Sequence, residues 1–258
     1  MSTEQPLRHR RILVTRPQGQ AHTLAERLRS LGAEPLQFPA VRILPPGDWS
    51  AVDNALRHAP GFDWIVFTSA NGVRFSMERL EALGLGPAHL RATRIAVIGP
   101  ATANALQRWG LVPALMPLEF RSEAVADALG QVSGLRILLL RAQDARKALS
   151  DILRERGAQV EEVGVYRLHP LHNGPKIRGL FTPLPDLVTL TSPSIAHALA
   201  SVALSVEPPI PPQRLPAVCI GPITATAARA EGFPVVAVAT TYTEEGLVEA
   251  IVNAVRCL

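Results

Sequence analysis

The sequence predicts an α/β protein made of two similar lobes, each a parallel sheet with helices on both faces. One observation behind this prediction is an internal repeat: residues 11–16 (RILVTR) return as residues 136–141 (RILLLR), and Gly32 returns as Gly157. Both pairs are offset by 125 residues (136 − 11 and 157 − 32). A repeat of this length is a whole folding unit rather than one turn of a solenoid. The other observation is that short apolar runs alternate with amphipathic stretches, which is typical of βα units.

Two later echoes keep the same order along the chain. Thr68 and Ser69 correspond to Thr191 and Ser192, at an offset of 123 (191 − 68), and the pair 99–100 (GP) corresponds to 221–222 (GP), at an offset of 122 (221 − 99). A chain of 258 residues is also long enough to divide into two domains of roughly 110–130 residues.

The expected strands are continuous Val/Ile/Leu runs, as in strands buried on both faces. In chain order they are residues 11–15, 64–68, 94–98, 136–140, 187–190 and 217–220. The expected helices lie between them, at residues 22–31, 73–83, 101–109, 122–129, 145–156, 194–202, 224–230 and 244–254. In the first helix, Leu24, Leu28 and Leu31 form one apolar stripe.

Two longer extended segments, residues 36–44 and 160–168, follow the first βα unit of each half. Each exceeds the usual length of a strand, so we expect each to join a sheet and continue as a connector. Residues 169–185 and 207–212 are predicted to be loops. Glycines 32, 110, 157 and 232 each follow a helix, where a left-handed C-cap favours glycine.

Composition limits the function. The net charge of +4 and the pI of about 9.7 favour acidic ligands. Nucleic acid is a weaker prediction, because the basic residues are dispersed and few aromatic residues could stack on bases. Neither Cys219, in an apolar run, nor Cys257 belongs to a zinc motif, so we expect no metal and a buried, inert Cys219. No export signal or membrane-length apolar run is visible, which predicts a cytoplasmic protein.

Candidate binding residues stand where strands lead into helices, the place where parallel α/β sheets bind ligands. They are Arg16, Thr68, Ser69, Gly99, Thr102, Thr191, Ser192, Gly221 and Thr224. Free N–H groups at helix starts favour anions, although Ser and Thr at these places also serve simply as N-caps. Arg16 and its equivalent Arg141 could bind carboxylates, be solvated, or bridge the lobes. Phosphate-loop, nucleophile-elbow and dinucleotide motifs are absent, so an enzyme of this kind would act by positioning, without a cofactor.

An ordered series of motifs resembles the uroporphyrinogen-III synthase family of tetrapyrrole biosynthesis. The resemblance covers about residues 11–256 and rests on residues 14–17 with Gln20, 31–33, 67–73, 98–102, 156–158, 165–167, 191–194 and 220–222. It implies HemD-like lobes with exchanged elements. Residues 1–38 with 168–258 would form one lobe and residues 46–161 the other, joined by linker strands 39–45 and 162–167.

The resemblance also implies the reaction and the site. Hydroxymethylbilane, a linear tetrapyrrole, would lose water and close to uroporphyrinogen III with inversion of ring D. Tyr166 is then the candidate catalytic acid, unless it only packs between the lobes. The residues implied to bind substrate arms are Thr68, Ser69, Asn71, Thr102, Thr191, Ser192, Ser194 and Thr224. Relatives often have glycine where this chain has Ala142, which puts ligand approach there in doubt. We expect a monomer that binds neither membrane nor nucleic acid.

A non-enzymatic alternative stays open at this point. Two α/β lobes with a double connector also suit a cytoplasmic binding protein that closes on an anionic small molecule, and a fold alone does not decide function.

Overall fold

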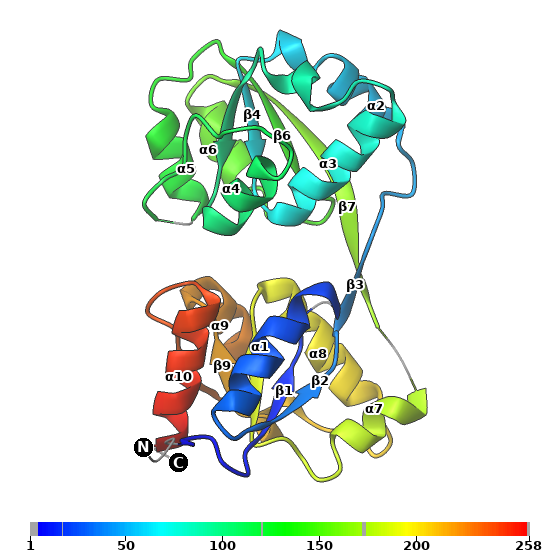
Figure 1. The fold of residues 1–258 in the computed structure, drawn as a ribbon, viewed down its shortest axis with the longest axis vertical. Helices are drawn as coiled ribbons and strands as arrows, with labels where there is room; N and C mark the ends of the chain where they lie inside the picture. Colours follow the sequence, from blue (N-terminus) through cyan, green and yellow to red (C-terminus); the bar gives the residue numbers. More distant parts are fainter. Residues whose placement is uncertain (1–4, 17, 120, 172–173, 257–258) are drawn as a thin grey trace. The chain divides into compact units, whose positions relative to one another are not determined.

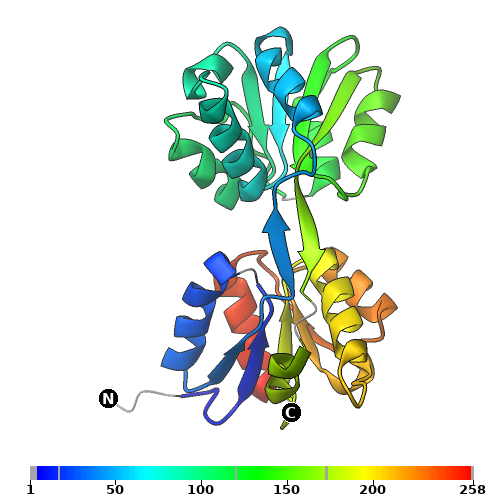
Figure 2. The same cartoon turned by 90° about the vertical axis from the view of Figure 1, so that its right-hand side faces the viewer.

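A computed structural model describes residues 5–16, 18–119, 121–171 and 174–256 (Figure 1). The chain forms two compact units. Unit 1 contains Met1–Arg42 and His169–Leu258, and unit 2 contains Ile43–Leu168. Each has one five-stranded sheet, and helices lie on both faces of each sheet (Figure 2). The predicted class, two three-layer α/β/α lobes with parallel sheets, is therefore confirmed.

The sheet of unit 1 has the strand order β10-β9-β8-β1-β2. Its strands are β1 (Arg11–Val14), β2 (Glu34–Gln37), β8 (Leu187–Leu190), β9 (Ala217–Cys219) and β10 (Val235–Val238). Helices α1 (Gln18–Ser30) and α10 (Glu244–Arg256) contact each other, as do α8 (Pro193–Ser205) and α9 (Pro222–Ala230). Apolar side chains of α1 and α10 pack with those of β1 and β9 in one core cluster.

The sheet of unit 2 has the order β3-β7-β6-β4-β5. Its strands are β3 (Val41–Leu44), β4 (Trp64–Phe67), β5 (Arg94–Val97), β6 (Arg136–Ala142) and β7 (Gln159–Pro170). One face carries α2 (Ser50–Arg57), α3 (Ala70–Ala82) and α4 (Pro100–Gln107), and the other carries α5 (Ser122–Leu129) and α6 (Ala148–Glu155). The chain passes between units within β3 and β7, which are neighbours in this sheet.

The internal repeat reappears in the topology, with the predicted exchange. In unit 2, β4 pairs with β5 and β6; in unit 1, its counterpart β8 pairs with β9 and β1. Strand β1, from the start of the chain, thus fills in unit 1 the place that β6 fills in unit 2. It is secured there by side chains: the Thr15 hydroxyl donates to the carbonyl of Thr189, and the Thr189 hydroxyl donates to that of Leu13 at 3.2 Å.

Most predicted elements appear with ends shifted by a few residues, but one prediction was wrong. Segment 36–44 joins a sheet and continues as a connector, as predicted: it ends β2 in unit 1 and then forms β3, with residues 38–40 outside both strands. Segment 169–185 is not a continuous loop: β7 runs to Pro170, and α7 (Gly174–Leu180) follows. Ile177 in α7 and Phe181 directly after the helix, four residues apart, are both buried and provide the apolar side of this segment. Helix α2 and strand β10 were not predicted.

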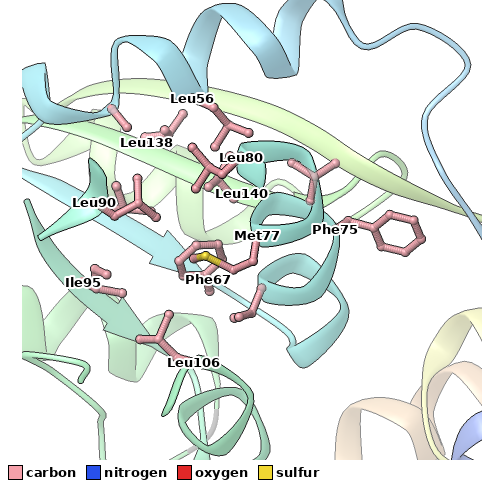
Figure 3. Packing of buried hydrophobic residues seen from close by; sticks show 14 of the residues in the cluster. Leu56, Phe67, Phe75, Met77, Leu80, Leu90, Ile95, Leu106, Leu138 and Leu140 are labelled. Carbon is pink, nitrogen blue, oxygen red and sulfur yellow. The ribbon is translucent and has the colours of Figure 1, made fainter. Parts of the chain in front are cut away.

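One apolar core cluster of unit 2 lies between its sheet and the helices α2, α3 and α4 (Figure 3), and a second lies on the face covered by α5 and α6. Phe67 on β4 is fully buried, Met77 of α3 lies beside its ring, and Leu80 of the same helix belongs to the same cluster. Figure 3 shows Phe75 at the margin of the cluster, with its ring pointing away from Phe67.

The glycines predicted to end helices have positive φ angles: Gly32 (93°), Gly110 (69°), Gly157 (85°) and Gly232 (87°). Gly157→Ala is expected to lower the free energy of unfolding by about 2 kcal/mol, because a left-handed alanine is strained and its Cβ would lie 2.9 Å from Ser133 Oγ. At Gly110 nothing lies within 4 Å of such a Cβ. Gly110→Ala should therefore cost only the backbone strain, about 1 kcal/mol. Urea unfolding measures both, and equal losses would contradict the steric explanation.

Candidate functional site

In unit 2, the predicted residues gather at the carboxyl edge of the sheet. Strands β4 and β5 are parallel neighbours, so the helices that follow them begin at the same edge. Thr68 and Ser69 follow β4, and Asn71 lies in the first turn of α3. Gly99 precedes α4, and Thr102, in its first turn, is buried.

The hydroxyl group of Ser69 makes two polar contacts. It is the N-cap of α3, where its Oγ accepts a hydrogen bond from the N–H of Gly72 at 3.0 Å. The same Oγ lies 3.0 Å from the hydroxyl oxygen of Tyr166, and either group could donate. Ser69 and Tyr166 are 97 residues apart in sequence, so the fold itself creates this pair. Strand β7 carries Tyr166 in register with Ala142 at the end of β6.

The ring of Tyr166 belongs to the core of unit 2. Its exposed fraction is 7%, and it stacks on Phe75 with ring centroids 5.8 Å apart and an interplanar angle of 13°. Burial raises the pKa of Tyr166, while the hydrogen bond with Ser69 and the positive charge of Arg141 oppose that rise. The phenol is therefore protonated at neutral pH and is suited to donate a proton rather than to accept one.

The side chain of Arg141 is buried and paired within its own unit. Its side chain is 5% exposed, and its Nη1 lies 3.0 Å from a carboxylate oxygen of Glu162 on the adjacent strand. Burial lowers the pKa of Arg141 and the charge of Glu162 opposes this. Arg154 pairs with the other oxygen of Glu162 at 2.9 Å. Glu162, the carboxylate that pairs with Arg141, belongs to the same unit.

The backbone at Ala142 is extended. Ala142 is the last residue of β6, and the next amide, of Gln143, donates to the carbonyl of Tyr166 at 2.8 Å. An extended backbone accommodates alanine without strain. The Cβ of Ala142 is therefore accommodated without backbone strain.

In unit 1, the corresponding residues lie at the carboxyl edge of its own sheet. Ser192 is the N-cap of α8, with Oγ accepting from the N–H of Ile195 at 3.3 Å. Thr191 precedes it and Ser194 lies in the first turn, both half-buried. Thr224, in the first turn of α9, is buried.

The side chain of Arg16 also forms an ion pair with a carboxylate of its own unit. Its Nη1 lies 2.8 Å from an oxygen of Glu244 at the start of α10, and both side chains are mostly buried. Burial lowers the pKa of Arg16, and the charge of Glu244 opposes this. Arg27 lies 3.6 Å from the other oxygen of Glu244. Pro17, the next residue of this predicted motif, lies outside the described residues.

Two aromatic residues near these edges were missed by the sequence analysis. In the sequence, Phe75 is an ordinary apolar residue of a predicted helix; in the structure, its ring stacks on that of Tyr166. Tyr242 is 44% exposed, and its ring carbon Cδ1 would lie 3.2 Å from a Cβ added at Gly221. Gly221, the N-cap residue that precedes α9, has an extended backbone (φ −175°). Its missing side chain therefore matters for this close approach and not for its φ angle.

Cys219 is fully buried in β9, as predicted, and burial raises its pKa to about 11. Cys257 lies outside the described residues. Because the pKa of the buried thiol is raised, its neutral form stabilises the folded state below pH 9, and this stabilisation is lost as the pH rises towards 11.

Among the described residues, no cluster of three or more His, Cys, Asp or Glu side chains could hold a metal ion. No helix in the described ranges is long and apolar enough to span a membrane.

We expect Cys219 to resist thiol reagents in the native protein. At pH 8 only roughly 10⁻³ of a thiol with this pKa is ionised, against roughly a tenth of a thiol with the ordinary pKa of 9.0 in the unfolded chain. A coloured disulfide reagent, added to a Cys257→Ser variant with and without urea, measures the rate. Equal rates in the two conditions would show that the thiol is accessible in the native state.

The fold and these sheet edges define the class of protein: a duplicated α/β protein with hydroxyl groups and helix starts at the carboxyl ends of its parallel strands. Such positions are suited to bind small anionic ligands. The sequence model described as "Uroporphyrinogen-III synthase HemD" matches residues 22–249, which include parts of both units. The chain belongs to the uroporphyrinogen-III synthase (HemD) family.

Individual relatives agree with this family. The chain is 30% identical over 230 residues to the "Porphyrin biosynthesis protein HemD" of Ruminiclostridium josui, covering 88% of this chain and 45% of that protein. It is 35% identical over 165 residues to the uroporphyrinogen-III synthase of Synechococcus elongatus, covering 63% of this chain and 62% of that protein. A putative synthase of Methanothermobacter thermautotrophicus is 30% identical, with coverage of 83% and 86%. This chain thus spans only about half to three fifths of the length of the first two relatives.

Solved structures share the fold. A mutant uroporphyrinogen III synthase of Thermus thermophilus aligns over 96% of this chain and 99% of its own, with a TM-score of 0.69 and 21% identity. The synthase of Helicobacter pylori aligns over 95% and 99%, with a TM-score of 0.61 and 21% identity.

Proposed function

We propose that this chain is a uroporphyrinogen-III synthase that converts hydroxymethylbilane into uroporphyrinogen III. The observation that carries the proposal is the family match over residues 22–249. The site supports it, because a substrate with many carboxylates suits a basic protein with hydroxyl groups at several helix starts.

The proposed reaction begins with loss of the terminal hydroxyl of the bilane. Protonation of this hydroxyl lets it leave as water, and the resulting azafulvene closes through a spiro intermediate that inverts ring D. A proton is then released to restore the aromatic pyrrole, so atoms and charge balance. Closure without inversion occurs spontaneously, and the main task of the protein is to hold the chain in the geometry that inversion requires.

Tyr166 is the proposed acid of the first step. Its phenol is protonated at neutral pH, since its pKa lies above the ordinary value, and a positioned acid accelerates proton transfer by about 10²–10⁴. Arm-binding is proposed for the hydroxyl, glycine and amide groups at the strand ends. These are Thr68, Ser69, Asn71, Gly99 and Thr102 in unit 2, and Thr191, Ser192, Ser194, Gly221 and Thr224 in unit 1.

Arg16 is proposed as a further substrate ligand. Glu244 engages one of its nitrogens, and a guanidinium has donors left for a second carboxylate. The proposal also retains 39–45 and 162–167 as linker strands, and a monomeric, cytoplasmic protein that needs no cofactor and binds neither membrane nor nucleic acid.

Measurement of turnover distinguishes an enzyme from a non-enzymatic binding protein. Freshly prepared hydroxymethylbilane is mixed with protein at a small fraction of its concentration, and bilane consumption is followed beside a protein-free sample. We expect many equivalents to be consumed faster than in that sample. Consumption at the protein-free rate, or protection of one equivalent of bilane, would instead identify a binding protein.

A further inference from the structure

The hydroxyl of Ser69 has little capacity left for a substrate. A serine hydroxyl has one proton to donate and two lone pairs. The N–H of Gly72 occupies one lone pair, and the hydroxyl of Tyr166 lies at hydrogen-bond distance from the same oxygen. Both contacts come from within unit 2, so they do not depend on a ligand.

The direction of the Ser69–Tyr166 bond decides what the phenol can do. If Tyr166 donates to Ser69, its proton is engaged and it cannot also donate to a substrate. If Ser69 donates, its oxygen still accepts from Gly72 and the phenol proton is free. A chain then runs from the Gly72 N–H through Ser69 to Tyr166, in which each bond polarises the next.

We propose that Ser69 is a positioning residue for Tyr166: its hydroxyl, fixed by the start of helix α3, donates to the phenol oxygen and leaves the phenol proton free for the leaving hydroxyl of the substrate. This inference rests on the proposed function, and it replaces the direct contact of Ser69 with a substrate arm. Ser69 acts through Tyr166 and touches no reacting atom.

Close packing holds the donor in place. A Cβ added at Gly72 would lie 3.0 Å from the carbonyl oxygen of Leu140 on β6, so the glycine lets the first turn of α3 lie against the sheet. Phe75, one turn further along α3, stacks on the tyrosine ring. The oxygen and the ring of Tyr166 are thus both located by α3, and the hydrogen bond with Ser69 offsets part of the rise that burial causes in the pKa of Tyr166.

The internal repeat supplies a matched control. Ser192 is the counterpart of Ser69, and it caps α8 through the N–H of Ile195. The repeat counterpart of Tyr166 is Val41 (166 − 125), which has no hydroxyl. Within the described part of the chain, the bonds shown for Ser192 include no tyrosine. Ser69→Ala and Ser192→Ala therefore both remove a helix cap, but only the first removes a contact with a phenol.

The kinetic experiment is a double-mutant cycle measured as kcat for formation of isomer III. We expect Ser69→Ala to lower kcat about tenfold, Ser69→Thr to restore most of it, and Ser69→Ala to have little further effect in a Tyr166→Phe background. Ser192→Ala should combine with Tyr166→Phe multiplicatively, as independent sites do. If the effects of Ser69→Ala and Tyr166→Phe also multiply, the inference is wrong while the proposed function stands.

A second measurement needs no substrate, so it separates the inference from the proposed function. The chain has two tyrosines, and a Tyr242→Phe background leaves Tyr166 as the only phenol to titrate by ultraviolet absorbance. We expect Ser69→Ala to raise the titration midpoint, Ser69→Thr to return it, and Ser192→Ala to leave it in place. A midpoint unchanged by Ser69→Ala would overturn the inference even if the protein is an active synthase.

Discussion

Tyr166→Phe is expected to lower kcat for isomer III by about 10²-fold without abolishing turnover. The substitution removes a proton donor, an effect typical of general acids, while the positions that hold the folded bilane stay in place. Phenylalanine keeps the ring that stacks on Phe75, so the core of unit 2 should remain intact. Steady-state kinetics of the purified variant measure the change.

The control for this prediction is stability. Urea unfolding of Tyr166→Phe should show a loss of only about 1 kcal/mol, the contribution of one hydrogen bond. An unchanged kcat would remove the tyrosine from the mechanism and assign it to packing against Phe75 alone. A large loss of stability together with kcat would mean that the kinetic loss reflects unfolding.

Phe67→Ala is expected to have the largest effect on stability, a loss of about 4 kcal/mol in the free energy of unfolding. Phe67 is fully buried on β4 and is among the largest fully buried side chains. Met77 and Leu80 of α3 and Leu140 of β6 are in the same cluster (Figure 3), so truncation leaves a cavity that a sheet and a helix cannot close without moving. Denaturant unfolding followed by circular dichroism measures the loss.

The matched control is a large apolar side chain in solvent. Leu118, in the same unit, is 99% exposed, and Leu118→Ala should change stability by less than about 0.5 kcal/mol. Similar losses for the two variants would contradict the position of Phe67 in the core. A loss confined to one of two unfolding transitions would further show that the units unfold independently.

The sequence predicted the fold well where local patterns determine structure. Buried parallel strands such as 187–190 are recognisable as apolar runs, and glycines such as Gly157 mark helix ends because other residues are strained there. The exchange of β1 into unit 1 could not be read from periodicity, since the same strands fit tandem lobes equally well. That prediction came from the resemblance to a family.

The site was predicted less completely, because its contacts are distant in sequence. Hydroxyl groups at strand ends could be recognised from their positions before helices. The pairing of Ser69 with Tyr166 could not, since it depends on the order of strands β4, β6 and β7 in one sheet. Likewise, Glu162 becomes the partner of Arg141 only through the pairing of β6 with β7.

The measurement that tests the central claim most directly is the isomer ratio of the cyclised product. The protein is given fresh hydroxymethylbilane, the products are oxidised to porphyrins, and the I and III isomers are separated by chromatography beside a protein-free sample. The account predicts that isomer III predominates with the protein and isomer I without it. The same excess of isomer I in both samples would contradict the assignment of this chain as a uroporphyrinogen-III synthase.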